Sequence, residues 1–168
     1  MASLDENETP QFINVAYGLT PEQVYKFELD EKNNFFCECR YLTEIITLDN
    51  TVINREAPIL VPHTKNDNFP DDKAYIEAFE FIMTYMGKKE REFPALEAPI
   101  NDSKIRDWMK KSKDEDLFKP YTTQLNDDAL KQIQLIVIIA NYLDMPVLIN
   151  KLCSLIASSM LKKHNVIP

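Results

Sequence analysis

The stretch that decides the fold is Gln132-Ile133-Gln134-Leu135-Ile136-Val137-Ile138-Ile139-Ala140-Asn141-Tyr142-Leu143-Asp144-Met145-Pro146-Val147-Leu148. A nearly unbroken apolar run ends in a short polar break at 141–146, and a second amphipathic run follows. A helix that is apolar on almost every side belongs inside a domain, because water tolerates an apolar side poorly. The stretch therefore predicts two packed helices, at 125–140 and 145–162, with a tight junction between them. Such an Ala-Asn-Tyr-Leu-Asp junction suggests a protein built for contact with another protein.

Length and composition limit the class of protein. The chain has 168 residues, of which 45% are hydrophobic, enough for one domain with extensions and a sizeable core. Its formal net charge of −8 disfavours nucleic acid, since an acidic surface repels phosphate, and it favours basic partner surfaces. Only two glycines are present, which nearly excludes phosphate-binding loops and dinucleotide fingerprints.

Cysteine usage and the apolar runs bear on the cellular compartment. The three cysteines are an odd number, and no signal-peptide pattern opens the chain. No apolar run reaches the roughly 18 residues that are needed to span a bilayer. We therefore expect a protein of the cytoplasm or the nucleus that has no membrane partner.

The amino-terminal part predicts an arm and then strands. Residues 1–23 are polar with isolated apolar residues and are expected to form an arm without a core of its own. Residues 24–29 alternate between apolar and polar, and together with 35–41 they predict a hairpin around an asparagine-bearing turn. Residues 44–51 fit either a short helix or a strand, and the proline-bounded run at 57–62 fits an edge strand.

The rest of the chain predicts helices. Asp71 or Asp72 can cap a helix over 74–86, whose apolar positions recur at helical spacing. Strands that come first, with helices after them, indicate an α+β fold rather than alternating βαβ units. The domain is expected to span 24–163, with a charged, proline-bearing insert at about 88–124.

Residues with catalytic or metal-binding chemistry are scattered. His63 and His164 are far apart in the sequence, and Cys37 and Cys39 lack a second pair at the spacing of a zinc site. Cys153 is expected to face the core, where a free cysteine behaves as a small hydrophobe. No nucleophile motif of the Gly-x-Ser-x-Gly kind is present, and the paired carboxylates suit solvated surface or helix caps. We expect no enzyme, no catalytic residue, no cofactor and no metal ion.

Three residues are candidates for contact with a partner protein. Trp108, the lone tryptophan, lies in a charged segment, where it either fills a groove of its own domain or anchors a partner. Asn141 and Tyr142 form an amide–aromatic pair at the helix junction that can reach solvent or a partner. The alternative for this pair is an ordinary helix end, because asparagine caps helices readily.

At this junction the chain resembles the Skp (S-phase kinase-associated protein) family, small adaptors with the BTB/POZ fold, and elongin C in particular. Residues 135–145 are similar to a helix of the family and its Ala-Asn-Tyr-Leu-Asp-Ile junction, and 148–160 are similar to the apolar ladder of the next helix. The run at 58–62 and the helix at 74–86 also look like family elements, whereas the opening strands match in pattern only. The resemblance implies a small mixed sheet flanked by α-helices.

The resemblance also implies a function. Members of the family are non-catalytic adaptors, in which one surface meets a cullin scaffold and another holds a substrate receptor such as an F-box protein. The family's Asn-Tyr pair lies at the cullin surface and matches Asn141 and Tyr142. We therefore expect an adaptor of a cullin-based ubiquitin ligase. The alternative is a structural POZ-fold subunit of a large stable assembly, which the long arm at 1–20 and the early end after the second helix favour.

Overall fold

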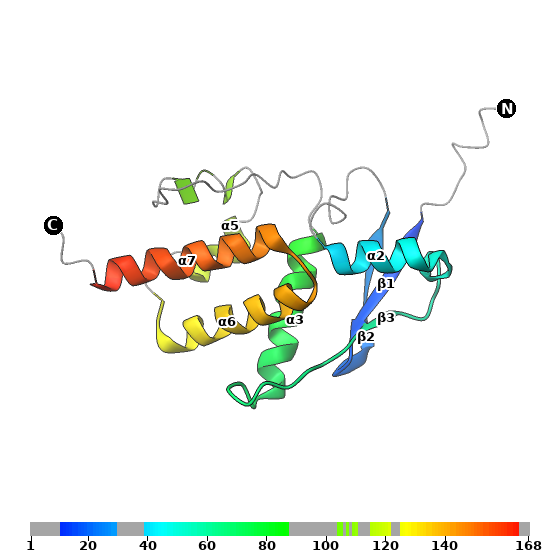
Figure 1. Ribbon diagram of the computed structural model, residues 1–168, viewed down its shortest axis with the longest axis horizontal. Coiled ribbons are helices and arrows are strands. Elements are labelled where there is room, and N and C mark those ends of the chain that lie inside the picture. The colour runs from blue at the N-terminus through cyan, green and yellow to red at the C-terminus, as the bar shows by residue number, and fades with distance from the viewer. Residues whose placement is uncertain are drawn as a thin grey trace.

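The computed structural model describes residues 11–29, 39–87, 104–105, 107, 109–110, 115–121 and 125–164, the last range with side chains to residue 159. These residues form an α+β fold, as the order of strands and helices predicts. A small sheet lies at one end, a pair of long helices lies at the other, and a further helix stands between them (Figure 1).

The sheet has the order β2-β1-β3 within the described residues. The middle strand, β1 (Phe12–Tyr17), runs antiparallel to β2 (Thr20–Glu28) and parallel to β3 (Ile59–Val61). Ile13 and Val15 of β1 point to the same face and are fully buried, as the two-residue period of a strand dictates. The short strand predicted at the edge of the sheet is confirmed as β3.

The position of β1 corrects the prediction of an amino-terminal arm. The sequence predicts that residues 1–23 lack a core of their own, yet 12–17 form the central strand of the sheet. Apolar residues that look isolated in a polar segment alternate along this strand, and pairing with a neighbour on each side buries them. Residues 1–10 lie outside the described part of the chain.

The hairpin also differs from the prediction. β2 pairs with the strand before it across a two-residue turn at Gly18 and Leu19. The strand predicted at 35–41 is wrong at its end, because α2 (Arg40–Leu48) begins there, and its first four residues lie outside the described part. An alternating pattern is compatible with more than one partner strand. The short turn at Gly18 favours pairing of β2 with β1, its neighbour in the sequence.

The segment 44–51, left open between helix and strand by its sequence, is helical. It forms the end of α2 and the start of η2 (Asn50–Val52), with Asp49 between the two. The Asp49 carboxylate accepts hydrogen bonds from the backbone N–H of Thr51, at 3.1 Å, and from the Thr51 hydroxyl. This cap ends one helix and begins the next.

The helix α3 (Asp72–Gly87) packs one side against the sheet. The Asp71 carboxylate accepts a hydrogen bond from the N–H of Lys73 at 3.0 Å, so the aspartate cap is confirmed. The ring of Phe79 stacks on the ring of Tyr17 in β1, with 4.6 Å between centroids and 11° between planes. The predicted helix is confirmed and starts two residues earlier than expected.

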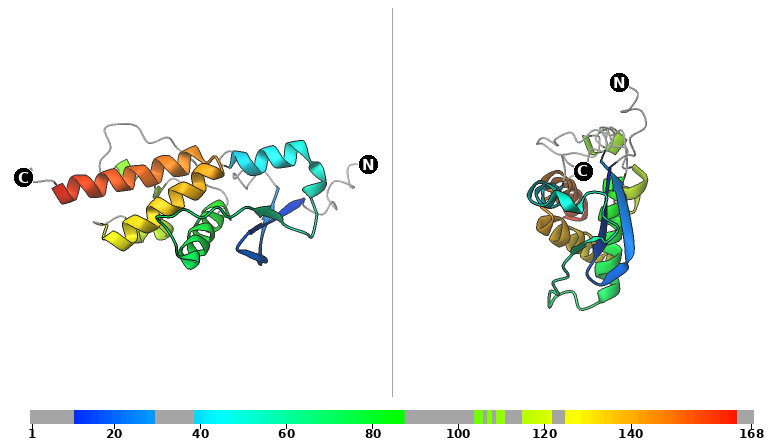
Figure 2. Two further views of the ribbon diagram at one scale, coloured as in Figure 1. Left: turned by 60° about the horizontal axis from the view of Figure 1, so that its bottom comes forward. Right: turned by 90° about the vertical axis from the view of Figure 1, so that its right-hand side faces the viewer.

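The two carboxyl-terminal helices are confirmed as α6 (Asp127–Tyr142) and α7 (Pro146–His164). They lie side by side, and α3 crosses α6 on its way to the sheet (Figures 1 and 2). The Asn126 side chain caps α6 by accepting a hydrogen bond from the N–H of Ala129 at 2.8 Å. One side of α6 faces solvent, where Ile138 is exposed, so the expectation of a helix buried almost all round is too strong.

The described parts of the predicted insert at 88–124 include α5 (Glu115–Phe118) and η3 (Lys119–Tyr121). Phe118 is fully buried, and its ring meets the ring of Phe81 in α3 edge-on at 5.4 Å between centroids. Edge-to-face pairs of this kind add to the gain from burial. This part of the insert therefore belongs to the core around α3.

Candidate protein-binding site at the helix junction

The junction between α6 and α7 is a tight turn fixed by backbone hydrogen bonds. The N–H of Met145 donates to the C=O of Ala140 at 3.1 Å, and the N–H of Asp144 donates to the C=O of Asn141 at 3.1 Å. Asp144 has a left-handed backbone with φ of 53°, which aspartate tolerates better than most residues. These features form a Schellman motif, with Asp144 in the place usually taken by glycine.

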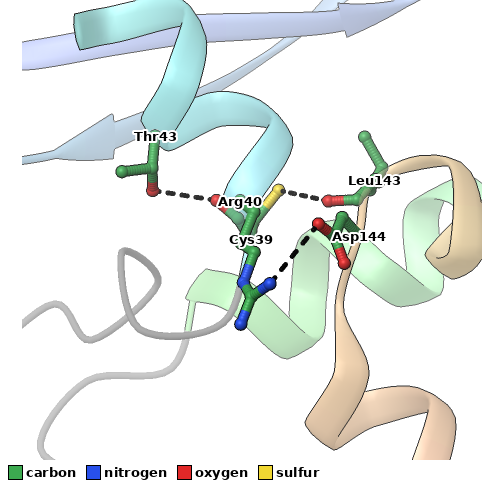
Figure 3. A network of polar contacts seen from close by, with 5 residues as sticks. All are labelled: Cys39, Arg40, Thr43, Leu143 and Asp144. Carbon is green, nitrogen blue, oxygen red and sulfur yellow. Dashed lines mark hydrogen bonds and ion pairs between the residues drawn. The ribbon is translucent and has the colours of Figure 1, made fainter.

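The start of α2 contacts this junction through Cys39 and Arg40 (Figure 3) and is hydrogen-bonded to it through the backbone. The backbone N–H groups of Arg40 and Tyr41 donate to the C=O groups of Asp144 and Leu143, at 3.3 and 3.2 Å. The buried Cys39 thiol donates to the same Leu143 oxygen at 3.6 Å. The Cys39 side chain does not cap α2, and the junction carbonyls satisfy N–H groups that a helix start otherwise leaves without a partner.

Two further contacts support the start of α2. The Thr43 hydroxyl donates to the C=O of Cys39 at 2.9 Å. The Arg40 guanidinium lies 3.9 Å from the Asp144 carboxylate, with side chains 67% and 56% exposed. An ion pair this open to water contributes at most about 1 kcal/mol. The backbone bonds, rather than this ion pair, therefore hold α2 on the junction.

The cysteines lie elsewhere than the sequence predicts. Cys39, expected on a strand, precedes α2, and Cys37 lies outside the described residues. Cys153, expected in the core, is exposed on α7. Leu152 and Leu155 occupy the buried side of that helix, and Cys153 falls on the opposite side of the turn.

Asn141 and Tyr142 are both exposed on the last turn of α6, as expected of a pair that can reach a partner. The Tyr142 side chain is 46% exposed, and its ring lies 5.3 Å from the ring of Tyr41, centroid to centroid. Burial and a hydrogen bond with Tyr142 raise the pKa of Tyr41 to about 12, so its hydroxyl stays neutral. The exposed pair at the junction thus has a second tyrosine beside it.

Sequence reasoning missed Tyr41 because it placed this residue on a strand. Nothing local in the sequence signals the contact, since the two tyrosines meet only through the docking of α2 on the junction. Ile138, four residues before Tyr142, extends the exposed side of α6 by one turn. The third predicted partner residue, Trp108, lies outside the described residues.

Other candidate chemistry is limited within the described part of the chain. No group of three His, Cys, Asp or Glu residues there could hold a metal ion. The Nδ1 atom of His63 lies 2.7 Å from the Tyr17 hydroxyl, and its ring meets that of Tyr75 edge-on. No helix among these residues is both long enough and apolar enough to cross a bilayer.

No family model, curated protein or solved structure matches the chain. The junction combines an exposed aromatic side chain, a neighbouring exposed amide and a backbone fixed by hydrogen bonds between residues that are in part buried. Such a preorganised surface loses little freedom on association, which suits the binding of a protein.

Proposed function

We propose that this chain is a non-catalytic adaptor of the Skp type, which links a substrate receptor to a cullin-based ubiquitin ligase. The observation that carries the proposal is the exposed pair Asn141 and Tyr142 on the last turn of α6, next to a junction that backbone hydrogen bonds fix. Aromatic side chains in central, well-supported positions carry most of the energy in protein interfaces. The resemblance to the Skp family assigns this pair to the cullin surface.

The BTB/POZ fold is part of the same proposal. A mixed sheet flanked by helices agrees with what the resemblance implies. The elements β3, α3, α6 and α7 lie where the family's strand, helix and helix pair are expected from the sequence. This agreement of order supports the POZ assignment.

An adaptor needs a second surface for the receptor. The outer side of α7 carries the exposed residues Cys153 and Ala157, next to the half-buried Ile149 and Ile156. A row of small and apolar side chains on one side of a helix suits the packing of a second helix. We assign the receptor to this side of α7.

The test is direct binding of the full chain to the amino-terminal domain of a cullin, measured by calorimetry. Tyr142→Ala is expected to weaken binding by about 2 kcal/mol or more, roughly thirtyfold in Kd, as for an interface hot spot. Asn141→Ala should also weaken it. Leu60→Ala is the matched control, since Leu60 is 52% exposed on β3 and lies outside the junction.

Two outcomes contradict the proposal. Unchanged affinity in Tyr142→Ala would show that the junction is not the cullin surface. A wild-type chain that does not bind the cullin domain, but stays with one complex through a high-salt wash, would favour the structural-subunit alternative. Circular dichroism of each variant checks that the helices are retained.

A further inference from the structure

The exposed Tyr142 side chain at the junction is continued on α2 by Tyr41 and Ile45, which are half-buried, and by Leu48. Tyr41, Ile45 and Leu48 follow one another at spacings of four and three residues, so they share one side of that helix. Leu48 is 86% exposed, the most exposed large apolar side chain in the described residues. On α6, Ile138 and Tyr142 form a similar row, and the contact between the two tyrosine rings joins the rows. We call these five residues the α2–α6 strip.

The length of the strip can be worked out from helix geometry. Seven residues of α2 between Tyr41 and Leu48 rise by about 10 Å, and four residues of α6 between Ile138 and Tyr142 rise by about 6 Å. With 5.3 Å between the tyrosine rings, the path along the strip from Leu48 to Ile138 is about 20 Å long. α2 and α6 lead away from the junction in different directions, so the strip is not confined to one helix (Figure 1). Its length corresponds to about four turns of a helix.

Acidic side chains flank the Leu48 end of the strip, whereas Arg40, beside Tyr41, is paired with Asp144. Glu44 lies one turn before Leu48, and Asp49 directly follows it, both exposed. Hydrogen bonds from Thr51 hold the pKa of Asp49 below its usual value, so this carboxylate keeps its charge. The whole chain carries a net charge of −8, so a second copy would bring like charges together across this surface. A basic partner suits the surface better than a second copy does.

We propose that the α2–α6 strip binds an amphipathic helix of a partner protein, whose apolar side is flanked by lysine or arginine. The inference deepens the proposed function, because it names the kind of segment that meets the junction and extends the contact from Tyr142 to Leu48. Apolar anchors at i, i+3, i+4 and i+7 are the usual way in which a helix fills such a surface. Basic flanks would lie against Glu44 and Asp49.

The experiment uses two synthetic helices of about 18 residues, five turns, with the same leucine side. One carries lysine on both flanks of that side and the other carries glutamate. Each is titrated against the full chain by fluorescence anisotropy. The lysine-flanked helix is expected to bind at least about tenfold more tightly, and added salt should reduce the difference.

The variant pair Leu48→Ser and Leu60→Ser locates the contact. Both leucines are highly exposed, so neither replacement removes core packing. Leu48→Ser should weaken binding of the lysine-flanked helix by about tenfold, as expected for losing one apolar anchor, whereas Leu60→Ser should not. Ile138→Ser tests the other half of the strip in the same assay.

Each contrary result overturns the inference. Equal binding of the two helices would show that the partner does not need basic flanks. An equal effect of Leu48→Ser and Leu60→Ser would show that the helix does not bind at the strip. Absence of binding to either helix does the same, as does a dimer of the chain that Leu48→Ser dissociates. The cullin titration is scored separately. Peptide binding at the strip without cullin binding contradicts the proposed function only, and cullin binding without peptide binding contradicts this inference only.

Discussion

Asp144 allows the backbone and the side chain of the junction to be tested separately. Asp144→Asn removes the ion pair with Arg40 but keeps a residue type that tolerates the left-handed backbone. Because the two side chains are 3.9 Å apart and mostly exposed, this loss is expected to cost at most about 1 kcal/mol. Arg40→Ala removes the same ion pair from the other side and should cost a similar amount.

Asp144→Val adds a second cost to the loss of the ion pair. At a φ of 53° the branched side chain is too close to the following carbonyl, a penalty of about 1–2 kcal/mol. The valine variant is therefore expected to be less stable than the asparagine variant by about that amount. Asp144→Gly has no such penalty and should lie near the asparagine variant.

The assay is urea unfolding of the full chain, followed by circular dichroism at the helical band. Variants are compared by their midpoints at a common slope, so that a change in slope is not mistaken for a change in stability. Equal stability of the valine and asparagine variants would show that the left-handed turn carries no cost. A loss of more than about 2 kcal/mol in Asp144→Asn would show that the ion pair is stronger than its exposure allows.

Two further predictions concern Tyr41 and Phe79. The free energy of unfolding should fall as pH rises from about 10, the usual pKa of tyrosine, towards about 12, because the unfolded chain then loses the phenol proton before folded Tyr41 does. Tyr41→Phe should make this fall shallower in a urea series across that range, and an unchanged fall contradicts it. Phe79→Ala should cost about 3–5 kcal/mol, since Phe79 is buried and stacks on Tyr17. Phe69→Ala, in a half-buried loop position, should cost clearly less free energy of unfolding in the same assay. Equal losses would show that Phe79 is not a central residue of the core.

Local signals predicted the helices of the carboxyl-terminal half well. The apolar spacing of α6 and α7 and the polar break between them are properties of neighbouring residues, as is the cap at Asp71. A helix forms its hydrogen bonds within one segment, so its pattern can be recognised without knowing the rest of the fold. The boundaries moved by one or two residues, and the sides that Cys153 and Ile138 face were predicted wrongly.

The sheet and the docking of α2 depend on contacts distant in the sequence. Cys39 and Leu143 are separated by 104 positions, and their hydrogen bond has no local signal. β1 was predicted as part of an arm because the residues around it are polar. Its inward-facing residues are buried only because strands pair with it on both sides, and those pairings cannot be recognised from the local sequence. The polar break predicted that Asn141 and Tyr142 are exposed. It did not predict that the ring of Tyr41 lies against the ring of Tyr142.

The central place of β1 also governs how the domain can be shortened. The order β2-β1-β3 leaves β2 and β3 without direct pairing among the described residues, so β1 alone joins them. Deletion of residues 1–23 is a natural choice because the segment is polar. It would remove β1, the strand with which both β2 and β3 pair. A protease site or an affinity tag placed close before Phe12 is therefore safer than one placed inside the segment that follows.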